Sequence, residues 1–446
     1  MDSLVSSPSK EYFNLFDHCF ISSNRDGDSF VGIETTNDEI GYKIFFPLGF
    51  KFPETETELR EDIQKLIEIL TKYSNSEGKL FDTNDNKEQI SKFPFNSYKD
   101  VIDYYFLHGA KYYVEKEEKY RTSDNGIIDW TRTINKHHPH IQRVKGKCNI
   151  IYTDFEVKVF DNNENQEITF INKYCVYRAF QQIGWLYGSY LPEKCSLDID
   201  LNLNAAIAVV QKKLFSTNDD DKRILFESML NILRNEEIVL NNMKQYIGTY
   251  HFEKVWEWLI DKAYGISDKE QYFPRAYWKL KGNKDDKYVK LNPLIPDTIM
   301  VVEDNDEYSE SSNKEEDNRK IYILDAKYYK YGVTANPNDL PNTSSVCKQI
   351  SYGEYLEKYL KIEPKNIFNA FVMPYNMFLN EFNSKNELLC IGAAEGEWRT
   401  NVYHYEHILG ILLDTKYLMY NYNKNQNYNI KKLATLIEDE IAKIEN

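Results

Sequence analysis

The stretch "IYILDAKYY", residues 321–329, decides how the chain is interpreted. Its isoleucine, leucine and tyrosine residues have the composition of a buried β-strand. Side chains alternate between the two faces of a strand, so Asp325 and Lys327 point the same way, on the face that Ile323 also occupies. A charged pair at the end of an apolar strand face predicts a strand that leaves the core and opens into a cleft.

The segment before this strand contributes a second carboxylate. "DTIMVV" (297–302) has the pattern of another strand, and residues 303–320 between the two carry eight acidic against three basic side chains. Such a segment is predicted to be a flexible hairpin loop, because it cannot bury enough apolar surface to offset its ordering entropy. If the two strands pair through this loop, Asp297 and Asp325 converge at one end of the hairpin.

Two carboxylates and a lysine at one sheet edge can bind a hard divalent cation. Mg²⁺ prefers oxygen ligands and retains several waters, so a pair of carboxylates is sufficient. Lys327 can then position a water molecule while the cation stabilises charge on a phosphate oxygen. The alternative is an ordinary surface ion pair, because isolated Asp-x-Lys tripeptides are common. The apolar strand, the upstream Pro-Asp and a following helix that carries Gln349 favour the metal site.

The carboxy-terminal part, residues 246–446, is predicted to be an α/β domain with its own core. Its order is helix, strand, strand, helix, strand, strand, helix, helix. These elements are expected at 251–265, 297–302, 320–329, 344–361, 367–375 and 387–394, with two helices from about 404.

The amino-terminal part, residues 1–245, is predicted to be a mixed α+β region with a sub-boundary near 100–125. Apolar residues at helical spacing indicate helices, and alternation of β-branched and aromatic residues indicates strands within 147–160. The helices are expected at 58–73, 98–120, 172–191, 204–215 and 221–246.

Composition narrows the class of protein. The chain has 446 residues, a net charge of −15 and six scattered cysteines without a CxxC pair. The charge weakens a nucleic-acid hypothesis without excluding it, because only a local basic surface is needed. The cysteine pattern argues against a zinc ribbon or a disulfide framework. The sequence has neither a signal peptide nor a membrane span, so we expect a soluble cytoplasmic protein that does not act at a membrane.

These motifs resemble a known nuclease superfamily. "PD" at 296–297 and "DAK" at 325–327 are similar to the PD-(D/E)xK signature, and the predicted order resembles its αβββαβ core, a mixed sheet flanked by helices. More narrowly, "IPDTIM", "IYILDAKYY" and "CKQISYGEY" resemble the LlaJI-type restriction endonucleases and the McrC nuclease subunits. "FEKVWEWLIDKAYG" (252–265) and "NGIIDWTRTINKHHPHI" (125–141) look like segments of the same group, so the resemblance extends from about 125 to 355.

The resemblance implies a role for each matching residue. Asp297 and Asp325 would be metal ligands, and Lys327 would be the catalytic lysine. Glu257 would be a helix carboxylate that assists the metal site, and Gln349 would contact the metal-bound water or the phosphate backbone.

Three further residues are weaker candidates. Glu253 lies four residues before Glu257 on the same helical face and competes for its role. Lys348 and Tyr352, on the predicted helix that also carries Gln349, are candidates for contacts to the DNA backbone.

Other features have mundane interpretations that we favour. "KHHPH" (136–140) is predicted to be a solvated loop, since its spacing is unspecific for a metal site. Trp130 is expected to be a packing anchor at a domain junction, and Arg132 a surface arginine that can touch phosphate. The basic stretches 277–292 and 138–147 could line a DNA groove or simply be solvated.

The sequence thus predicts a type II restriction endonuclease of a phage defence system, acting on double-stranded DNA with Mg²⁺, or with Mn²⁺ in its place. Residues 1–245 would recognise DNA or a partner. One alternative is a McrC-like subunit that cuts only with a McrB-like AAA+ GTPase or ATPase motor. Another is a non-catalytic DNA-binding protein on a nuclease fold. A cognate methyltransferase is an expected partner, and a homodimer stays open, because restriction enzymes often dimerise to cut both strands.

Overall fold

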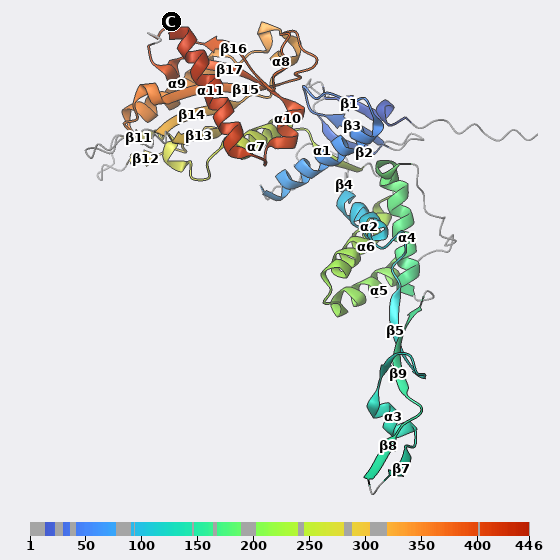
Figure 1. The fold of residues 1–446 in the computed structure, drawn as a ribbon. Coiled ribbons are helices and arrows are strands. Elements are labelled where there is room, and N and C mark those ends of the chain that lie inside the picture. Colours follow the sequence, from blue (N-terminus) through green and yellow to red (C-terminus); the bar gives the residue numbers. More distant parts are fainter. Residues whose placement is uncertain are drawn as a thin grey trace, which may run out of the picture. The chain divides into compact units, whose positions relative to one another are not determined.

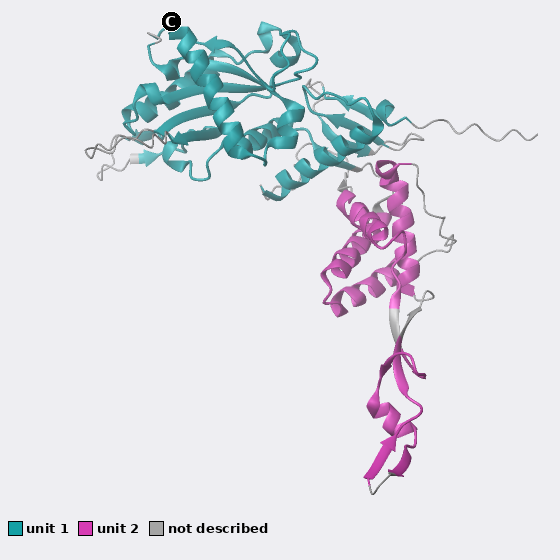
Figure 2. Cartoon of the chain, viewed as in Figure 1, with its two compact units in different colours: residues 1–88, 244–446 teal, residues 89–243 magenta. Residues whose placement is uncertain are grey.

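The structure, a computed structural model, forms two compact units (Figure 2): unit 1 comprises residues 1–88 and 244–446, and unit 2 comprises residues 89–243. Residues 1–88 therefore group with the carboxy-terminal part. Most of the predicted acidic loop, 304–318, lies outside the described residues. The structure describes residues 14–22, 30–35, 42–76, 91–92, 94–144, 147–163, 167–188, 202–239, 245–280, 288–303, 319–399 and 402–445.

A five-stranded mixed sheet is the centre of unit 1 (Figure 1). Its strands lie in the order β13 (Thr298–Glu303), β14 (Arg319–Ala326), β15 (Ile367–Tyr375), β17 (Ile408–Asp414) and β16 (Leu388–Ala394). Strands β14, β15 and β17 run parallel, whereas β13 and β16 are antiparallel to their neighbours. The predicted α/β class with a mixed sheet is confirmed.

Helices cover both faces of this sheet, as its apolar strands require. All nine residues of the central strand β15 are buried, which is typical of a parallel strand covered on both sides. Helix α9 (Thr343–Lys358) packs on the face of Ile323. Helices α7 (Phe252–Tyr264), α10 (Thr415–Asn421) and α11 (Gln426–Glu445) pack on the other face.

Unit 1 contains a second, smaller sheet built mainly from the amino-terminal residues. Strands β1 (Cys19–Ile21), β3 (Tyr42–Phe46), β2 (Val31–Thr35) and β10 (Gln245–Thr249) lie side by side in that order, with α1 (Glu56–Ser76) packed near them. The segment after β3 reaches the large sheet. There Leu48 N–H donates to the Tyr328 hydroxyl at 2.6 Å, and the Thr415 hydroxyl donates to Leu48 O at 2.8 Å.

Gly49 allows this close approach. Its φ of 76° lies in the left-handed region, and an added Cβ would lie 2.8 Å from Thr415 Oγ1 and 3.0 Å from the backbone of Tyr375. The small sheet is therefore attached to the edge of the large sheet at which β14 and β15 end.

Unit 2 combines a helical bundle with a β arm. The bundle consists of α2 (Phe95–Leu107), α4 (Glu167–Ile183), α5 (Leu203–Ser216) and α6 (Asp220–Val239). The arm begins with the long antiparallel pair β5 (Glu115–Thr122) and β9 (Glu156–Asn163) and continues through β6 (Ile127–Ile128), α3 (Trp130–Lys136), β7 (His140–Val144) and β8 (Lys147–Ile151).

Short elements complete the chain. They are β4 (Ser91–Lys92), β11 (Tyr277–Lys279), β12 (Tyr288–Lys290) and α8 (Tyr331–Thr334), with 3-10 turns η1 (Leu15–His18), η2 (Gly184–Tyr187), η3 (Glu270–Tyr272), η4 (Pro337–Asp339), η5 (Pro364–Asn366) and η6 (His404–Glu406). None of the helices in the described part of the chain has both the length and the apolar character that crossing a bilayer requires.

Two predicted helices are wrong in part. The helix predicted over 98–120 ends at Leu107, because Gly109 and Ala110 take positive φ values of 72° and 57°, and the chain then enters β5. The predicted pair of helices from about 404 begins only at Thr415, after strand β17. The short apolar run of β17 has no periodicity that separates a buried strand from a buried helix.

Candidate active site

The β13–β14 hairpin brings Asp297 and Asp325 to the same edge of the large sheet. Thr298 pairs with Leu324, so Asp297 lies directly before the paired residues and Asp325 directly after them. The Ala326 N–H donates to Asp297 Oδ2 at 2.9 Å, which fixes that carboxylate beside the end of β14. The Lys269 ammonium donates to the backbone carbonyl of Asp297 at 2.9 Å and so fixes the main chain at this residue.

Asp325 and Lys327 form a close buried pair. Lys327 Nζ lies 2.6 Å from Asp325 Oδ2, and the two side chains are 17% and 2% exposed. The approach lacks hydrogen-bond geometry, and neither oxygen of Asp325 accepts a hydrogen bond. The Lys327 N–H donates to Val372 O at 2.9 Å, so β15 holds its backbone. A buried carboxylate in this state has lone pairs left over for another partner.

Burial and the neighbouring charges shift the pKa values of Asp297 and Lys327. Burial, followed by the negative charge of Asp325, raises the pKa of Asp297 to about 8. Burial alone would lower the pKa of Lys327, but the attraction of Asp325 and Asp297 outweighs it, so this pKa is raised. Lys327 therefore stays protonated beside the Asp325 carboxylate, and the proximity of the two aspartates favours the protonated form of Asp297.

Helix α7 supplies the third carboxylate. Burial raises the pKa of Glu257, and the charge of Asp325 adds to this shift while Lys327 counteracts it, so Glu257 is electrostatically part of the cluster. Glu253 is 46% exposed and pairs instead with His251 at 2.9 Å. Of the two helix carboxylates that the sequence left open, the geometry favours Glu257.

Helix α9 places Gln349 and Tyr352 over the same face of the sheet. Gln349 is fully buried, yet neither its Nε2 nor its Oε1 has a hydrogen-bond partner. The Tyr352 hydroxyl is also buried without a partner, and its pKa is raised by burial and by the charges of Asp297 and Asp325. Lys348 lies 5.7 Å from the Tyr352 ring centroid. These unsatisfied groups are costly in a folded core and are typical of a binding site.

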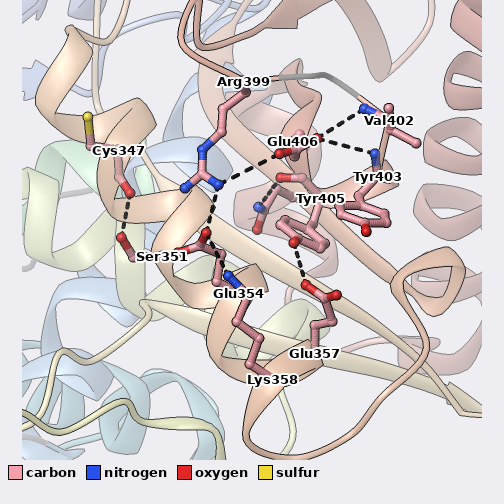
Figure 3. Close-up of polar contacts among 11 residues, drawn as sticks. Cys347, Ser351, Glu354, Glu357, Lys358, Arg399, Val402, Tyr403, Tyr405 and Glu406 are labelled. Carbon is pink, nitrogen blue, oxygen red and sulfur yellow. Dashed lines mark hydrogen bonds and ion pairs between the residues drawn. The ribbon is translucent and has the colours of Figure 1, made fainter.

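Two sets of contacts hold α9 in place. Within the core, Asn369 Nδ2 donates to Gln349 O at 3.1 Å and to Tyr405 O at 2.6 Å. On the outer side, Arg399 donates to Glu354 at 2.7 Å and the Tyr405 hydroxyl donates to Glu357 at 2.6 Å (Figure 3). The position of Gln349 is thus set by elements on both sides of its helix.

Tyr328 is a residue of this site that sequence reasoning missed. Its buried ring lies between those of Phe252 and Trp256, at centroid distances of 5.3 and 6.1 Å, and its hydroxyl accepts the hydrogen bond from Leu48. Tyr328 directly follows Lys327 and so links the candidate lysine to α7 and to the small sheet. Only its place within the apolar stretch 321–329 could have signalled this role.

The donor set fits a hard divalent cation that keeps part of its water shell. Among the described residues, no group of three His, Cys, Asp or Glu side chains forms a ready-made metal site. A pair of carboxylates, of which Asp325 has unsatisfied oxygens, a third carboxylate nearby and an unpartnered amide are the kinds of ligand and second contact that Mg²⁺ uses.

Residues of the predicted segment 125–141 lie in the arm of unit 2. Trp130 is 53% exposed and makes an edge contact with Phe155 at 5.9 Å. Arg132 lies 3.7 Å from the Tyr120 ring centroid. His137, in the segment predicted to be a solvated loop, bonds Glu156 at 3.0 Å, whereas His138 and His140 are exposed.

The basic stretches 277–292 and 138–147 are only partly described. In the first, Tyr277 and Trp278 of β11 are 63% and 61% exposed, and residues 281–287 lie outside the described residues. In the second, residues 145–146 do so.

The chain is similar to known proteins of restriction systems. Residues 30–389 match the family model of the LlaJI restriction endonuclease. The type II restriction enzyme BsuMI component YdjA of Bacillus subtilis (strain 168) is 26% identical over 343 residues, which cover 73% of this chain and 68% of that protein. A solved half-complex of Thermococcus gammatolerans McrB AAA+ hexamers with bound McrC is 13% identical, with a TM-score of 0.31, over 92% of this chain and 83% of that one.

Proposed function

Because the chain belongs to the LlaJI restriction endonuclease family, we propose that it is the Mg²⁺-dependent endonuclease of a restriction system that hydrolyses phosphodiester bonds in double-stranded DNA. The observation that carries this proposal is the buried cluster of Asp297, Asp325 and Lys327 at one sheet edge. The order of strands around the cluster supports a PD-(D/E)xK core. A cytoplasmic location, where DNA is available, goes with this function.

Asp297 and Asp325 would hold the Mg²⁺ ion, with Glu257 completing the site directly or through a bound water. When bound, the cation supplies positive charge to a phosphate oxygen and relieves the repulsion between the two aspartates. Mn²⁺ has the same preference for oxygen ligands and is the alternative ion.

Lys327 would orient the attacking water. Its ammonium, held by Asp325, can donate a hydrogen bond to a water oxygen and so position that water for attack at the phosphorus. As the new P–O bond forms, the attacking water gives up a proton to bulk solvent, the opposite P–O bond breaks, and the leaving oxygen takes up a proton from solvent. The Gln349 amide, which has no partner inside the protein, would donate to a phosphate oxygen or to this water.

Digestion of unmodified and methylated plasmid with purified protein and Mg²⁺ tests this function. We expect cutting that stops in EDTA and in the Asp325→Ala variant but persists in Lys385→Ala, a control at an exposed lysine. Mapping the ends would show whether the enzyme is site-specific. Unchanged cutting by Asp325→Ala would remove the site assignment.

A second candidate is a subunit that cuts only within an assembly. The relative YdjA is described as a component of its enzyme, which favours this alternative. The isolated protein would then bind Mg²⁺ yet leave DNA intact until its partner is added, either an AAA+ motor with nucleotide or another nuclease subunit. A cognate methyltransferase would protect host DNA in either case, and unit 2 would recognise DNA or the partner. Light scattering would show whether the protein forms a homodimer.

A third candidate, a non-catalytic DNA-binding protein, is disfavoured by the retained triad. The buried Asp325 and Lys327 are a cost that a purely structural protein has no reason to keep.

A further inference from the structure

Unit 2 contains a cavity of about 880 Å³ that the nuclease site does not explain. It lies where α2 ends and the chain passes through residues 108–114 into β5, beside α4 and α6. Its volume is within the range of pockets that hold small organic ligands. Its lining combines three tyrosines with three lysines: Tyr104, Tyr112, Tyr113, Lys111, Lys173 and Lys222.

The aromatic wall is held in place without a ligand. Tyr113 is 8% exposed, its N–H donates to Asn172 Oδ1 at 2.8 Å, and its ring meets the edge of Phe226 at 5.3 Å. Tyr104 stacks on His108 with ring centroids 4.0 Å apart. Ordered aromatic faces of this kind are the surfaces on which nucleic-acid bases stack.

The lysines leave positive charge at this wall. Lys111 and Lys173 have no carboxylate partner in the part of the chain that the structure describes, and Lys173 instead lies 5.5 Å from the Tyr112 ring centroid. The acidic lining residue Glu115 is neutralised by Lys213. Two lysines without a carboxylate partner among the described residues line the same cavity as the tyrosines, and this combination suits an anionic ligand with an aromatic part.

One polar group of the lining has no hydrogen-bond partner among the described residues. Thr169, on α4, is fully buried, and its hydroxyl makes no hydrogen bond. An unsatisfied buried hydroxyl costs stability unless something binds it.

We propose that this cavity binds a nucleotide, with the base on the tyrosines, the phosphate at Lys111 and Lys173, and the Thr169 hydroxyl as a further contact. The nucleotide is either free or part of an unpaired DNA strand, and the second source rests on the proposed function. In that case the pocket deepens the function, because unit 2 would grip a strand of the DNA that unit 1 cuts.

Binding by the full-length protein in EDTA tests the proposal without requiring cleavage. The probes are the four deoxynucleoside monophosphates, ATP, GTP and inorganic phosphate by calorimetry, and a fluorescent 15-nucleotide strand and its duplex by anisotropy. We expect Lys111→Glu combined with Lys173→Glu to weaken nucleotide or strand binding at least about tenfold. The matched control is Lys212→Glu, an exposed lysine of α5 that does not line the cavity.

The outcomes separate the two sources. Binding of free nucleotides that the double variant weakens identifies a nucleotide pocket, and binding of the single strand alone identifies a DNA contact. The proposal is overturned if no nucleotide or strand binds, if phosphate binds as tightly as the nucleotides, or if the double variant and Lys212→Glu behave alike.

One further variant tests the hydroxyl contact without disturbing the fold, and the binding conditions separate nucleotide binding from cleavage. Thr169→Val removes the hydroxyl at nearly constant shape, so we expect an unchanged or higher Tm and binding weaker by about threefold to tenfold. Equal affinity of this variant and the wild type would exclude the hydroxyl as a ligand contact. Binding is measured in EDTA, where no Mg²⁺ is available to the nuclease site, so a failure of the nuclease assignment and a failure of the pocket can be told apart.

Discussion

Two buried carboxylates in this chain have opposite surroundings. Glu156, in the arm of unit 2, is 3% exposed and accepts hydrogen bonds from Thr122 at 2.6 Å, Lys136 at 2.9 Å and His137 at 3.0 Å. Asp325, in unit 1, is 2% exposed, accepts no hydrogen bond and faces a second carboxyl group, that of Asp297.

The pKa values follow these surroundings. Hydrogen bonds from Thr122, Lys136 and His137 lower the pKa of Glu156 to about 2, whereas burial and Asp325 raise that of Asp297 to about 8. A carboxylate surrounded by donors joins the strands and the helix of the arm. Asp325 instead lies beside the Lys327 ammonium and a second carboxyl group whose pKa is raised, and a raised pKa of this kind is typical of functional sites. The comparison therefore suggests a criterion: a buried carboxylate with several hydrogen-bond donors serves the fold, and one with few donors marks a candidate functional site.

Removing the lysine of the unsatisfied cluster should have the largest effect. Lys327→Ala should lower the cleavage rate by about 10³-fold or more, because the water loses its positioning group and Asp325 loses the ammonium that pairs with it. Glu156→Gln, in the satisfied cluster, should leave cleavage by the assembled enzyme within about threefold. Initial rates on plasmid at saturating Mg²⁺ measure both. Equal losses in the two variants would mean that the donor count does not mark function.

The pH dependence of stability should sharpen the contrast at the nuclease site. The pKa of Asp297 is raised from 3.8 to about 8, so the folded state holds this proton more tightly, and its contribution to stability is complete below pH 4 and lost as the pH rises through 8. Thermal unfolding in EDTA between pH 5 and 9 should thus show a falling Tm that Asp297→Asn flattens. Added Mg²⁺ should raise the Tm of the wild type and not that of Asp297→Asn. A wild-type Tm that is constant over this range would contradict the assignment.

The stability of the arm of unit 2 should depend on pH in the opposite direction and fall as the pH is lowered. The pKa of Glu156 is lowered from 4.5 to about 2, so its contribution to stability is complete above pH 4.5 and lost as the pH falls through 2. Hydrogen exchange should show that the amides of β9 and α3 lose protection below pH 4. In Glu156→Gln, protection of these amides should already be lower at neutral pH and should change little on acidification. The control Asp124→Asn, at an exposed site on the same arm, should behave as the wild type does. If the wild-type amides keep their protection below pH 4, the interpretation that the ionised Glu156 carboxylate holds the arm together is wrong.

Substitution of Gln349 should have the smallest effect on cleavage, and it distinguishes a role in the site from a role in the fold. Gln349→Leu removes two unsatisfied buried polar atoms, so we expect stability to stay the same or rise by about 1 kcal/mol. The same change should lower cleavage by about tenfold, because a donor to the phosphate or water is lost. A variant that is less stable and equally active would show that the amide serves the fold. Urea unfolding and initial rates provide the two measurements.

Much of the nuclease site followed from local sequence. Alternation along 321–329 placed Asp325 and Lys327 together, and the hairpin with 297–302 brought in Asp297, because a strand's side-chain directions depend only on its own backbone. The helix positions of Glu257 and Gln349 came from the family resemblance; in the structure Glu257 is electrostatically coupled to Asp325 and Lys327, and Gln349 is buried without a hydrogen-bond partner among the described residues.

Other features were decided only by the tertiary structure. Glu156 meets donors that are 19 to 34 residues away in the chain, and Leu48 meets Tyr328 across 280 residues. Strand β17 was missed because its apolar residues suit either a buried strand or a buried helix until β15 pairs with it. Local periodicity encodes which face of an element is apolar, but the choice of neighbour is made by the packing of the whole core, and the surroundings of every buried charge depend on that choice.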